Sequence, residues 1–204
     1  MNAPPIIAFD ESAHRYTVNG RAVPSVTEVL RGAQDFSGIP PDVLEAAANR
    51  GRAVHRMVEL DISGTLDEAS VHDSIRPHLD HWRAFRESSG FQPIACEYLC
   101  ASARYGYAGR LDLIGTFPDK PGFAVIDLKT SAAIPASVGL QTAGYAQAVA
   151  EMAPAWFDSA QPLRRYCLHL TAGACRIKAL DNSADITVFN AALTIWRWCN
   201  DNKQ

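Results

Sequence analysis

Two acidic residues and a lysine lie in two stretches that alternate between apolar and polar side chains. Asp112 belongs to the stretch 109–117, and Asp127 and Lys129 belong to the stretch 123–130. Because successive side chains of a strand point to opposite faces, this alternation is typical of β-strands and places Asp127 and Lys129 on one face. The turn-forming sequence Pro-Asp-Lys-Pro-Gly separates the two stretches. The sequence therefore predicts a hairpin that carries charge on one face.

The register of this hairpin decides whether the charges meet. With the turn centred near Lys120, Asp112 and Asp127 fall opposite each other within about one residue. Opposed side chains have β-carbons about 5 Å apart, so two carboxylates repel there unless a cation lies between them. The same reasoning, applied to a turn near Arg104, brings Glu97 close to Asp112. We expect these acids to form a site for a hard divalent cation, which prefers oxygen ligands.

A charged strand face also has a simpler interpretation. Arg110 and Lys129 can neutralise the acids on a solvated surface that has no chemical role. The spacing of Asp127 and Lys129 favours chemistry instead, because it supplies a metal ligand and a neighbouring cation on one face. Such a lysine can orient a water or hydroxide nucleophile and offset the charge on a pentacoordinate phosphate. Phosphodiester hydrolysis requires both functions.

Four motifs, in this order along the chain, resemble those of the PD-(D/E)XK nucleases, within which the RecB-like and lambda-exonuclease-like branch is the most similar. The matching segments are Gly51–His55 for the GxxxH helix motif, Gly109–Asp112 for the G-x-x-D strand motif, Ile126–Ser131 for the D-x-K motif and Gln141–Tyr145 for the QxxxY helix motif. The opening hairpin with the sequence Pro-Ser-Val-Thr at 24–27 is similar to phage-type members. Each motif is weak alone, but their order and spacing over residues 9 to 150 form a joint signal.

The resemblance implies roles for individual residues. The ligands of one or two Mg²⁺ or Mn²⁺ ions would be His55, Asp112, Asp127 and the carbonyl of Leu128. Lys129 would be the catalytic lysine, with Glu97 as a further acid near the metal. The residues expected to line the site or contact DNA are Arg52, Arg110, Ser131, Gln141 and Tyr145. Some RecB-like relatives carry an iron–sulfur cluster, but we expect none here because the chain has no matching set of cysteines.

His55 would by itself be read as a structural histidine at the edge of an apolar helix face, and the accompanying motifs favour a ligand. Glu59 follows four residues later on the same helical face, so it can orient the imidazole ring from behind. Arg52 shares the helix, where it can hold a terminal phosphate with two hydrogen bonds or simply form a surface salt bridge.

Composition limits the remaining possibilities. With 204 residues and 48% hydrophobic side chains, the chain is expected to form a single domain over 1–204. The formal charge of -3 requires any nucleic-acid surface to be local. The five cysteines include no close pair and predict reduced thiols. No apolar run is long enough to cross a bilayer and the start lacks a secretory pattern, so we expect a soluble, cytoplasmic protein.

The elements expected around the motifs divide the chain into three parts, which together predict an α/β fold with a restriction-endonuclease-like core, a mixed central β-sheet flanked by helices. The first part, 1–90, should contain a hairpin turning at Asn19-Gly20, a helix capped by Ser25 and Glu28, a helix from 41 to about 62 with a break near Gly51, and a helical stretch at 68–87. The second, 91–152, should contain the catalytic strands and a helix from Pro135 to Met152. The third, 160–204, should contain strands at 163–170 and 175–180 and a closing helix at 184–199.

These features predict a Mg²⁺- or Mn²⁺-dependent deoxyribonuclease. We expect an exonuclease acting in phage-type recombination or DNA processing, because one compact domain offers no separate module for reading a base sequence. A structure- or sequence-specific endonuclease on the same fold is the alternative. A non-catalytic DNA-end-binding protein is a third interpretation, and the presence of Asp112, Asp127 and Lys129 argues against it. Besides DNA, the partners considered are a single-strand annealing or recombination protein and a second copy of the chain.

Overall fold

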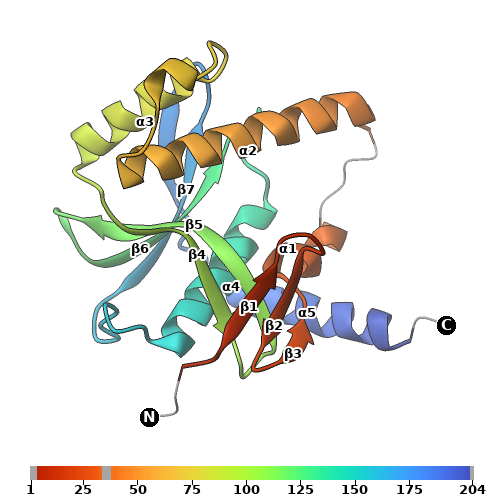
Figure 1. The fold of residues 1–204 in the computed structure, drawn as a ribbon. Helices are drawn as coiled ribbons and strands as arrows, with labels where there is room; N and C mark the ends of the chain where they lie inside the picture. The colour runs from red at the N-terminus through yellow and green to blue at the C-terminus, as the bar shows by residue number, and fades with distance from the viewer. Residues whose placement is uncertain (1–3, 34–37, 203–204) are drawn as a thin grey trace.

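The computed structural model describes residues 4–33 and 38–202. Its centre is a sheet with the strand order β4-β5-β6-β7-β8 (Figure 1). The strands are β4 (Gln92–Ser102), β5 (Tyr107–Phe117), β6 (Lys120–Lys129), β7 (Leu163–Leu170) and β8 (Cys175–Ala179). Neighbouring strands are antiparallel except β6 and β7, which are parallel and are joined through a helix. The expected mixed sheet is confirmed.

Helices cover both faces of this sheet. They are α1 (Val26–Val29), α2 (Pro41–Ser63), α3 (Arg76–Ser89), α4 (Ser137–Met152) and α5 (Asp185–Asp201). On the face of α2 and α3, Leu113 and Ile126 belong to one apolar core; on the face of α4 and α5, Ile114 and Val125 belong to a second. The last two side chains are fully buried and alternate in step with Asp112 and Asp127. The face that carries Asp112 and Asp127 is therefore not simply a solvated surface, because Ile114 and Val125 on the same face are buried in the core next to α4 and α5.

A small antiparallel sheet precedes this core. It consists of β1 (Ile7–Asp10), β2 (Arg15–Val18) and β3 (Arg21–Val23). Asn19 and Gly20 connect the last two strands with φ angles of 51° and 78°, the left-handed conformation that a two-residue hairpin turn requires. The sheet packs on the end of the β4–β5 hairpin, where Tyr16 contacts the cluster around Ala108 (Figure 1). The predicted hairpin is confirmed.

The capping box that was expected before the first helix is also present. The N–H of Glu28 donates to Ser25 Oγ at 3.0 Å, and the N–H of Ser25 donates to Glu28 Oε2 at 2.7 Å. Because each side chain satisfies a backbone donor that the helix cannot, α1 begins at a fixed point. The same segment lies beside the ends of β5 and β6, so the cap also fixes one wall of the candidate site.

Two helices differ from the prediction. α2 continues through Gly51 without the expected break. α3 begins only at Arg76, after a short 3₁₀ turn at Glu68–Ser70, instead of extending from residue 68. Pro77 explains the late start, because proline lacks an N–H and fits only the first turn of a helix. None of the helices in the described ranges is long and apolar enough to span a membrane.

Candidate active site

The β5–β6 hairpin brings the two central acids together. Leu113 pairs with Ile126 and Ile114 with Val125, so the next step of the same register places Asp112 beside Asp127. The predicted register is confirmed. The N–H of Leu128 donates to Asp112 Oδ2 at 2.6 Å, which fixes the first carboxylate against the backbone of the second strand.

Three side chains from three elements form a cluster around Asp112. His55 of α2 has its Nδ1 atom 3.5 Å from Asp112 Oδ1 and 3.6 Å from Glu97 Oε1 of β4. One ligand atom from each of the three residues lies within 4.8 Å of the other two. Glu97 has a φ of 50°, a strained conformation for a residue with a β-carbon, and Arg110 Nε holds its carboxylate at 2.8 Å. The surrounding contacts thus hold Glu97 toward the cluster.

The orientation of the His55 ring comes from the backbone of β6. Its Nε2 atom lies 3.1 Å from the carbonyl oxygen of Leu128. Donation from Nε2 leaves Nδ1 free to face the acids, and metal-binding histidines are commonly oriented in this way by a carbonyl. Glu59, which was expected to orient the ring, instead pairs with Arg56. That expectation was wrong, because the Leu128 carbonyl already occupies the position at Nε2.

A buried ion pair lies next to this cluster. Lys129 Nζ is 2.7 Å from Asp127 Oδ2, and Asp127 is only 1% exposed. Its other oxygen, Oδ1, is buried and has no hydrogen-bond partner within the described part of the chain. Asp127 is not one of the three clustered residues. A buried carboxylate oxygen without a donor is costly, and a cation would satisfy it.

Gln141 and Tyr145 of α4 form a chain of hydrogen bonds that ends at Lys129. Lys129 Nζ donates to Gln141 Oε1 at 3.3 Å, and Gln141 Nε2 donates to the Tyr145 hydroxyl at 3.2 Å. Both side chains are buried, with 7% and 3% exposed. Of the two roles considered for them, lining the site fits this burial, whereas contact with DNA does not.

The charges shift each other's ionisation. Burial raises the pKa of Asp127 to about 6; the charge of Asp112 adds to this rise and Lys129 opposes it. Burial opposes the charged form of His55, but the carboxylates of Asp112 and then Glu97 outweigh it and raise the pKa of His55 to about 10. Without a bound cation these carboxylates therefore favour the imidazolium form of His55, and a metal ion at Nδ1 would displace its proton.

Two glycines of the motifs permit close approaches. A β-carbon at Gly109 would lie 2.7 Å from Cε1 of Tyr145, so glycine lets the tyrosine ring pack directly on β5. At Gly51 a β-carbon would lie 3.4 Å from Oγ1 of Thr130, which shows how closely α2 passes the end of β6. Only the contact at Gly109 excludes a β-carbon and so gives a physical reason for glycine, because the distance at Gly51 is an ordinary van der Waals contact.

The remaining predicted site residues lie at or beyond the edge of the cluster. A cavity of about 880 Å³ opens over it and is lined by His55, Lys129, Arg52 and Arg110, among others. Arg52 is exposed and donates to Asn49. Ser131 donates its hydroxyl to the carbonyl of Ala133 and does not line this cavity.

Several residues at the site were not predicted as site residues. His14, Tyr16 and Thr27 line a smaller cavity of about 220 Å³ around Asp112. The sequence offered a weak signal for the last, since the segment 24–27 had already been singled out as similar to phage-type members. It offered none for His14, whose φ of 47° is a property of the folded turn.

The donors at this site fit a hard divalent cation. Glu97, Asp112 and Asp127 offer carboxylate oxygens and His55 offers one imidazole nitrogen, whereas none of the clustered residues is a cysteine. Oxygen-rich sets of this kind suit magnesium, manganese or calcium better than softer metals. The partnerless Oδ1 of Asp127 is a further acceptor for such an ion.

Comparisons with known proteins give one family match and several similar solved structures. A family model described as the PD-(D/E)XK nuclease superfamily matches residues 67–187, a range that contains β4, β5 and β6 but not His55. The solved structure of SSO0001 is similar, with 15% sequence identity, a TM-score of 0.40 and coverage of 86% of this chain and 75% of that one. LHK-Exo in complex with dAMP has 13% identity, a TM-score of 0.34 and coverage of 88% of both chains. No protein of curated function matches the sequence significantly.

Proposed function

Because the chain belongs to the PD-(D/E)XK nuclease superfamily, we propose that it is a divalent-metal-dependent deoxyribonuclease that degrades DNA from an end. Family membership supports the nuclease class. The observation that carries the location of the active site is the convergence of His55, Glu97 and Asp112 next to the buried pair of Asp127 and Lys129.

We assign the metal to the acids and the histidine of this cluster. His55 would bind through Nδ1, Glu97 and Asp112 through the oxygens that face it, and Asp127 through its partnerless oxygen. The Leu128 carbonyl has a second lone pair and can contribute a ligand while it orients His55. Bound Mg²⁺ or Mn²⁺ would supply positive charge to the phosphate oxygens and make a nearby water more acidic.

The side chains of the site supply the rest of the chemistry. In hydrolysis, a water oxygen forms a bond to phosphorus, the bond from phosphorus to the leaving oxygen breaks, and that oxygen takes a proton. The ammonium group of Lys129 would orient the attacking water and stabilise the negative charge that develops on the phosphate. Gln141 keeps this group in position, since its Oε1 accepts a hydrogen bond from Nζ.

The preference for an end rests on α2. Arg52 lies one turn before His55 on that helix and lines the same cavity. A terminal phosphate carries more negative charge than an internal one, and a guanidinium group can bind it with two hydrogen bonds. A role in phage-type recombination or DNA processing, with a single-strand annealing protein as partner, remains our prediction from the resemblance of the motifs.

The test compares end-labelled linear DNA with covalently closed circles. We expect progressive degradation of the linear DNA and survival of the circles with Mg²⁺ or Mn²⁺, and little turnover with Ca²⁺, whose looser geometry suits catalysis less. Arg52→Ala should slow digestion of 5′-phosphorylated ends more than of hydroxyl ends, while Arg176→Ala on the exposed surface of β8 serves as the matched control. Rapid linearisation of a closed plasmid would favour an endonuclease, and full activity after chelation would contradict the metal.

A further inference from the structure

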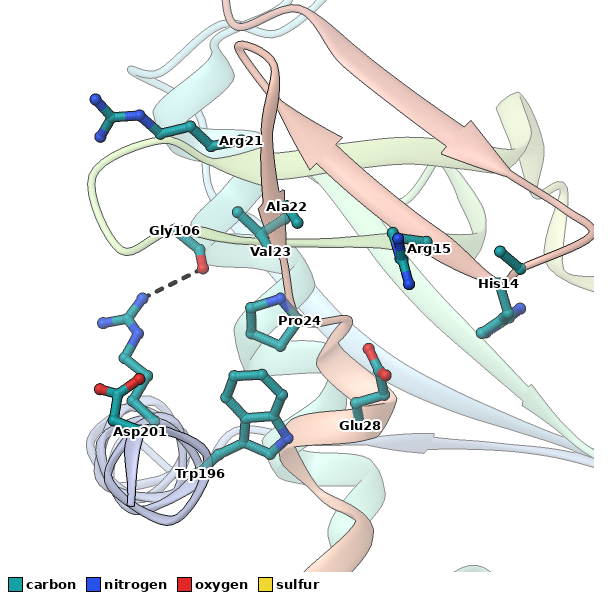
Figure 2. A pocket seen from close by; sticks show the side chains of 12 residues that line it. His14, Arg15, Arg21, Ala22, Val23, Pro24, Glu28, Gly106, Trp196 and Asp201 are labelled. Carbon is teal, nitrogen blue, oxygen red and sulfur yellow. Dashed lines mark hydrogen bonds between the residues drawn. The ribbon is translucent and has the colours of Figure 1, made fainter. Parts of the chain in front are cut away.

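A further cavity lies between the N-terminal sheet and the C-terminal helix. Figure 2 shows Arg15, Arg21 and Pro24 of the hairpin segment on one side and Trp196 of α5 on the other. The cavity has a volume of about 550 Å³. We call it the hairpin groove. Its walls combine cationic and aromatic side chains, which the active-site chemistry does not use.

Two of its cations are available for a ligand. Both side chains are exposed, and neither the Arg15 nor the Arg21 guanidinium group forms a side-chain hydrogen bond or a close ion pair with any residue in the ranges 4–33 and 38–202. Arg197, which also lines the groove, in contrast donates to the carbonyls of Tyr105 and Gly106. Unpaired arginines beside a cavity are the groups that bind phosphate oxygens.

The two acids that line the groove, Glu28 and Asp201, belong to α1 and α5 and not to the hairpin. Glu28 accepts the N–H of Ser25 in the capping box, so its carboxylate is already engaged with the start of α1. Asp201 lies at the last turn of α5, on the opposite wall from Arg15 (Figure 2). The hairpin residues that line the groove therefore include the cations Arg15 and Arg21 and no acid, although Asp10 lies opposite Arg15 in the strand register and the chain as a whole carries a net charge of -3.

The groove adjoins the active-site cavity at His14. His14 lines both the hairpin groove and the cavity around Asp112. It is exposed, holds the strained φ of 47° and lies edge-on to the ring of Phe9, with the ring centroids 5.3 Å apart. The segment around α1 separates the two spaces, because Thr27 lines the active-site cavity while Pro24 and Glu28 line the groove. A ligand that extends from Asp112 past His14 enters the groove.

We propose that the hairpin groove binds a single strand of nucleic acid that extends from the active site, an inference that rests on the proposed nuclease function. Arg15 and Arg21 bind its phosphates, and His14 and Trp196 contact its bases. Cationic grooves with interspersed aromatic rings are typical of single-strand binding. The volume is in the range of cavities that hold one small organic molecule, which fits a nucleotide or two of a single strand but not a duplex.

The first test measures binding without turnover. The affinity of a fluorescent single-stranded oligonucleotide of about twenty nucleotides is determined by anisotropy in chelator, over a series of salt concentrations. The double variant Arg15→Ala/Arg21→Ala should bind about tenfold more weakly, and its log–log salt slope should fall by about 1.4, which is 0.7 for each lost phosphate contact. Arg176→Ala/Lys178→Ala, which removes two exposed cations from β8, is the matched control and should change neither value.

Two further arms separate this inference from the proposed function. Hydrolysis of bis(p-nitrophenyl) phosphate, which is too small to reach the groove, should be unchanged in the double variant, and binding of a blunt duplex should weaken less than binding of the single strand. Unchanged single-strand affinity and salt slope would overturn the groove, and an equal loss for the duplex would overturn its single-strand preference. A wild-type protein that hydrolyses neither DNA nor the small diester with any divalent metal would overturn the nuclease proposal, while the binding experiment would still decide the groove.

Discussion

Two buried ion pairs on neighbouring strands are built in opposite ways. Arg165 of β7 pairs with Asp185 at the start of α5, with Nη1 at 2.9 Å from Oδ2. The same guanidinium group donates to the carbonyls of Gly139 and Asn182, at 2.7 and 2.8 Å. This pair joins β7, α4 and α5, and its arginine makes three close contacts.

The pair of Asp127 and Lys129 on β6 is not satisfied in this way. Asp127 Oδ1 has no hydrogen-bond partner among the described residues, and Asp112 lies close enough that its charge raises the pKa of Asp127. The attraction within a buried ion pair offsets the cost of desolvation only when further hydrogen bonds satisfy the remaining polar groups, and removing one partner is strongly destabilising. The comparison indicates that the pair of Arg165 and Asp185 holds α4 and α5 against β7. Asp112 and Asp127, in contrast, still repel each other, and a divalent cation would relieve that repulsion.

The largest effect should come from removing one of the repelling charges. Asp112→Asn and Asp127→Asn should each reduce metal-dependent cleavage to background, because each removes an anionic ligand. Asparagine retains an oxygen that can accept the N–H of Leu128, so the local backbone contact survives. At pH 7 the free energy of unfolding without metal should change by less than about 1 kcal/mol. Cleavage is measured on end-labelled DNA and stability by urea unfolding.

The contrasting substitution acts on the satisfied pair. Arg165→Ala should lower the free energy of unfolding by about 3 to 5 kcal/mol, because it leaves Asp185 as an uncompensated buried charge. Cleavage by the fraction that remains folded should be close to normal, since Arg165 does not line the candidate active site. If Arg165→Ala were as stable as the wild type, or if Asp127→Asn unfolded as readily as Arg165→Ala, the distinction between the two pairs would be wrong.

Lys129→Ala should have the next largest effect. It should slow cleavage by roughly two to three orders of magnitude, the scale for loss of one electrostatic stabiliser, and still bind metal. Gln141→Ala is an informative companion, because it leaves the ammonium group but removes the oxygen 3.3 Å from Nζ. A smaller loss is expected for it. Normal cleavage by Lys129→Ala would contradict the role assigned to the lysine.

Sequence periodicity was sufficient for the hairpin that carries Asp112 and Asp127. The alternation of side chains and one short turn determine its register, and both are local properties. The partner of His55 could not be found in this way, because the Leu128 carbonyl is 73 residues away along the chain. Spacing along a helix favoured Glu59, which is four residues away but turns to Arg56.

The satisfied pair was missed for a related reason. Arg165 and Asp185 belong to no motif, and their approach depends on how α5 packs against β7. A β-carbon at Gly139 would lie 2.7 Å from Asp185 Oδ2, so α4 also takes part in that packing. Strained φ angles, such as 50° at Glu97, are likewise produced by tertiary contacts. Sequence reasoning therefore located the acids and their cations Arg110 and Lys129, but not the backbone contacts and distant pairs that fix them in place.

The smallest effect expected is a dependence of stability on pH that originates at Asp127. Burial raises the pKa of Asp127 from the ordinary 3.8 to about 6 in the folded protein, so the folded state binds a proton more tightly than the unfolded state. The stability from this proton is fully present below about pH 4 and is lost as pH rises through about 6. One proton limits the slope to about 1.4 kcal/mol per pH unit.

The measurement is the difference in unfolding free energy between the wild type and Asp127→Asn, in chelator, from pH 4 to pH 7. The variant cannot titrate at this position, so subtracting its stability removes the contribution of the other carboxylates as far as they are independent of Asp127. We expect the wild type to lose stability relative to the variant as pH rises, with most of the loss between pH 4 and 6. If this difference in unfolding free energy did not change with pH, Asp127 would have an ordinary pKa in the folded protein, with its burial fully offset by Lys129. The contrast with the pair of Arg165 and Asp185 would then be lost.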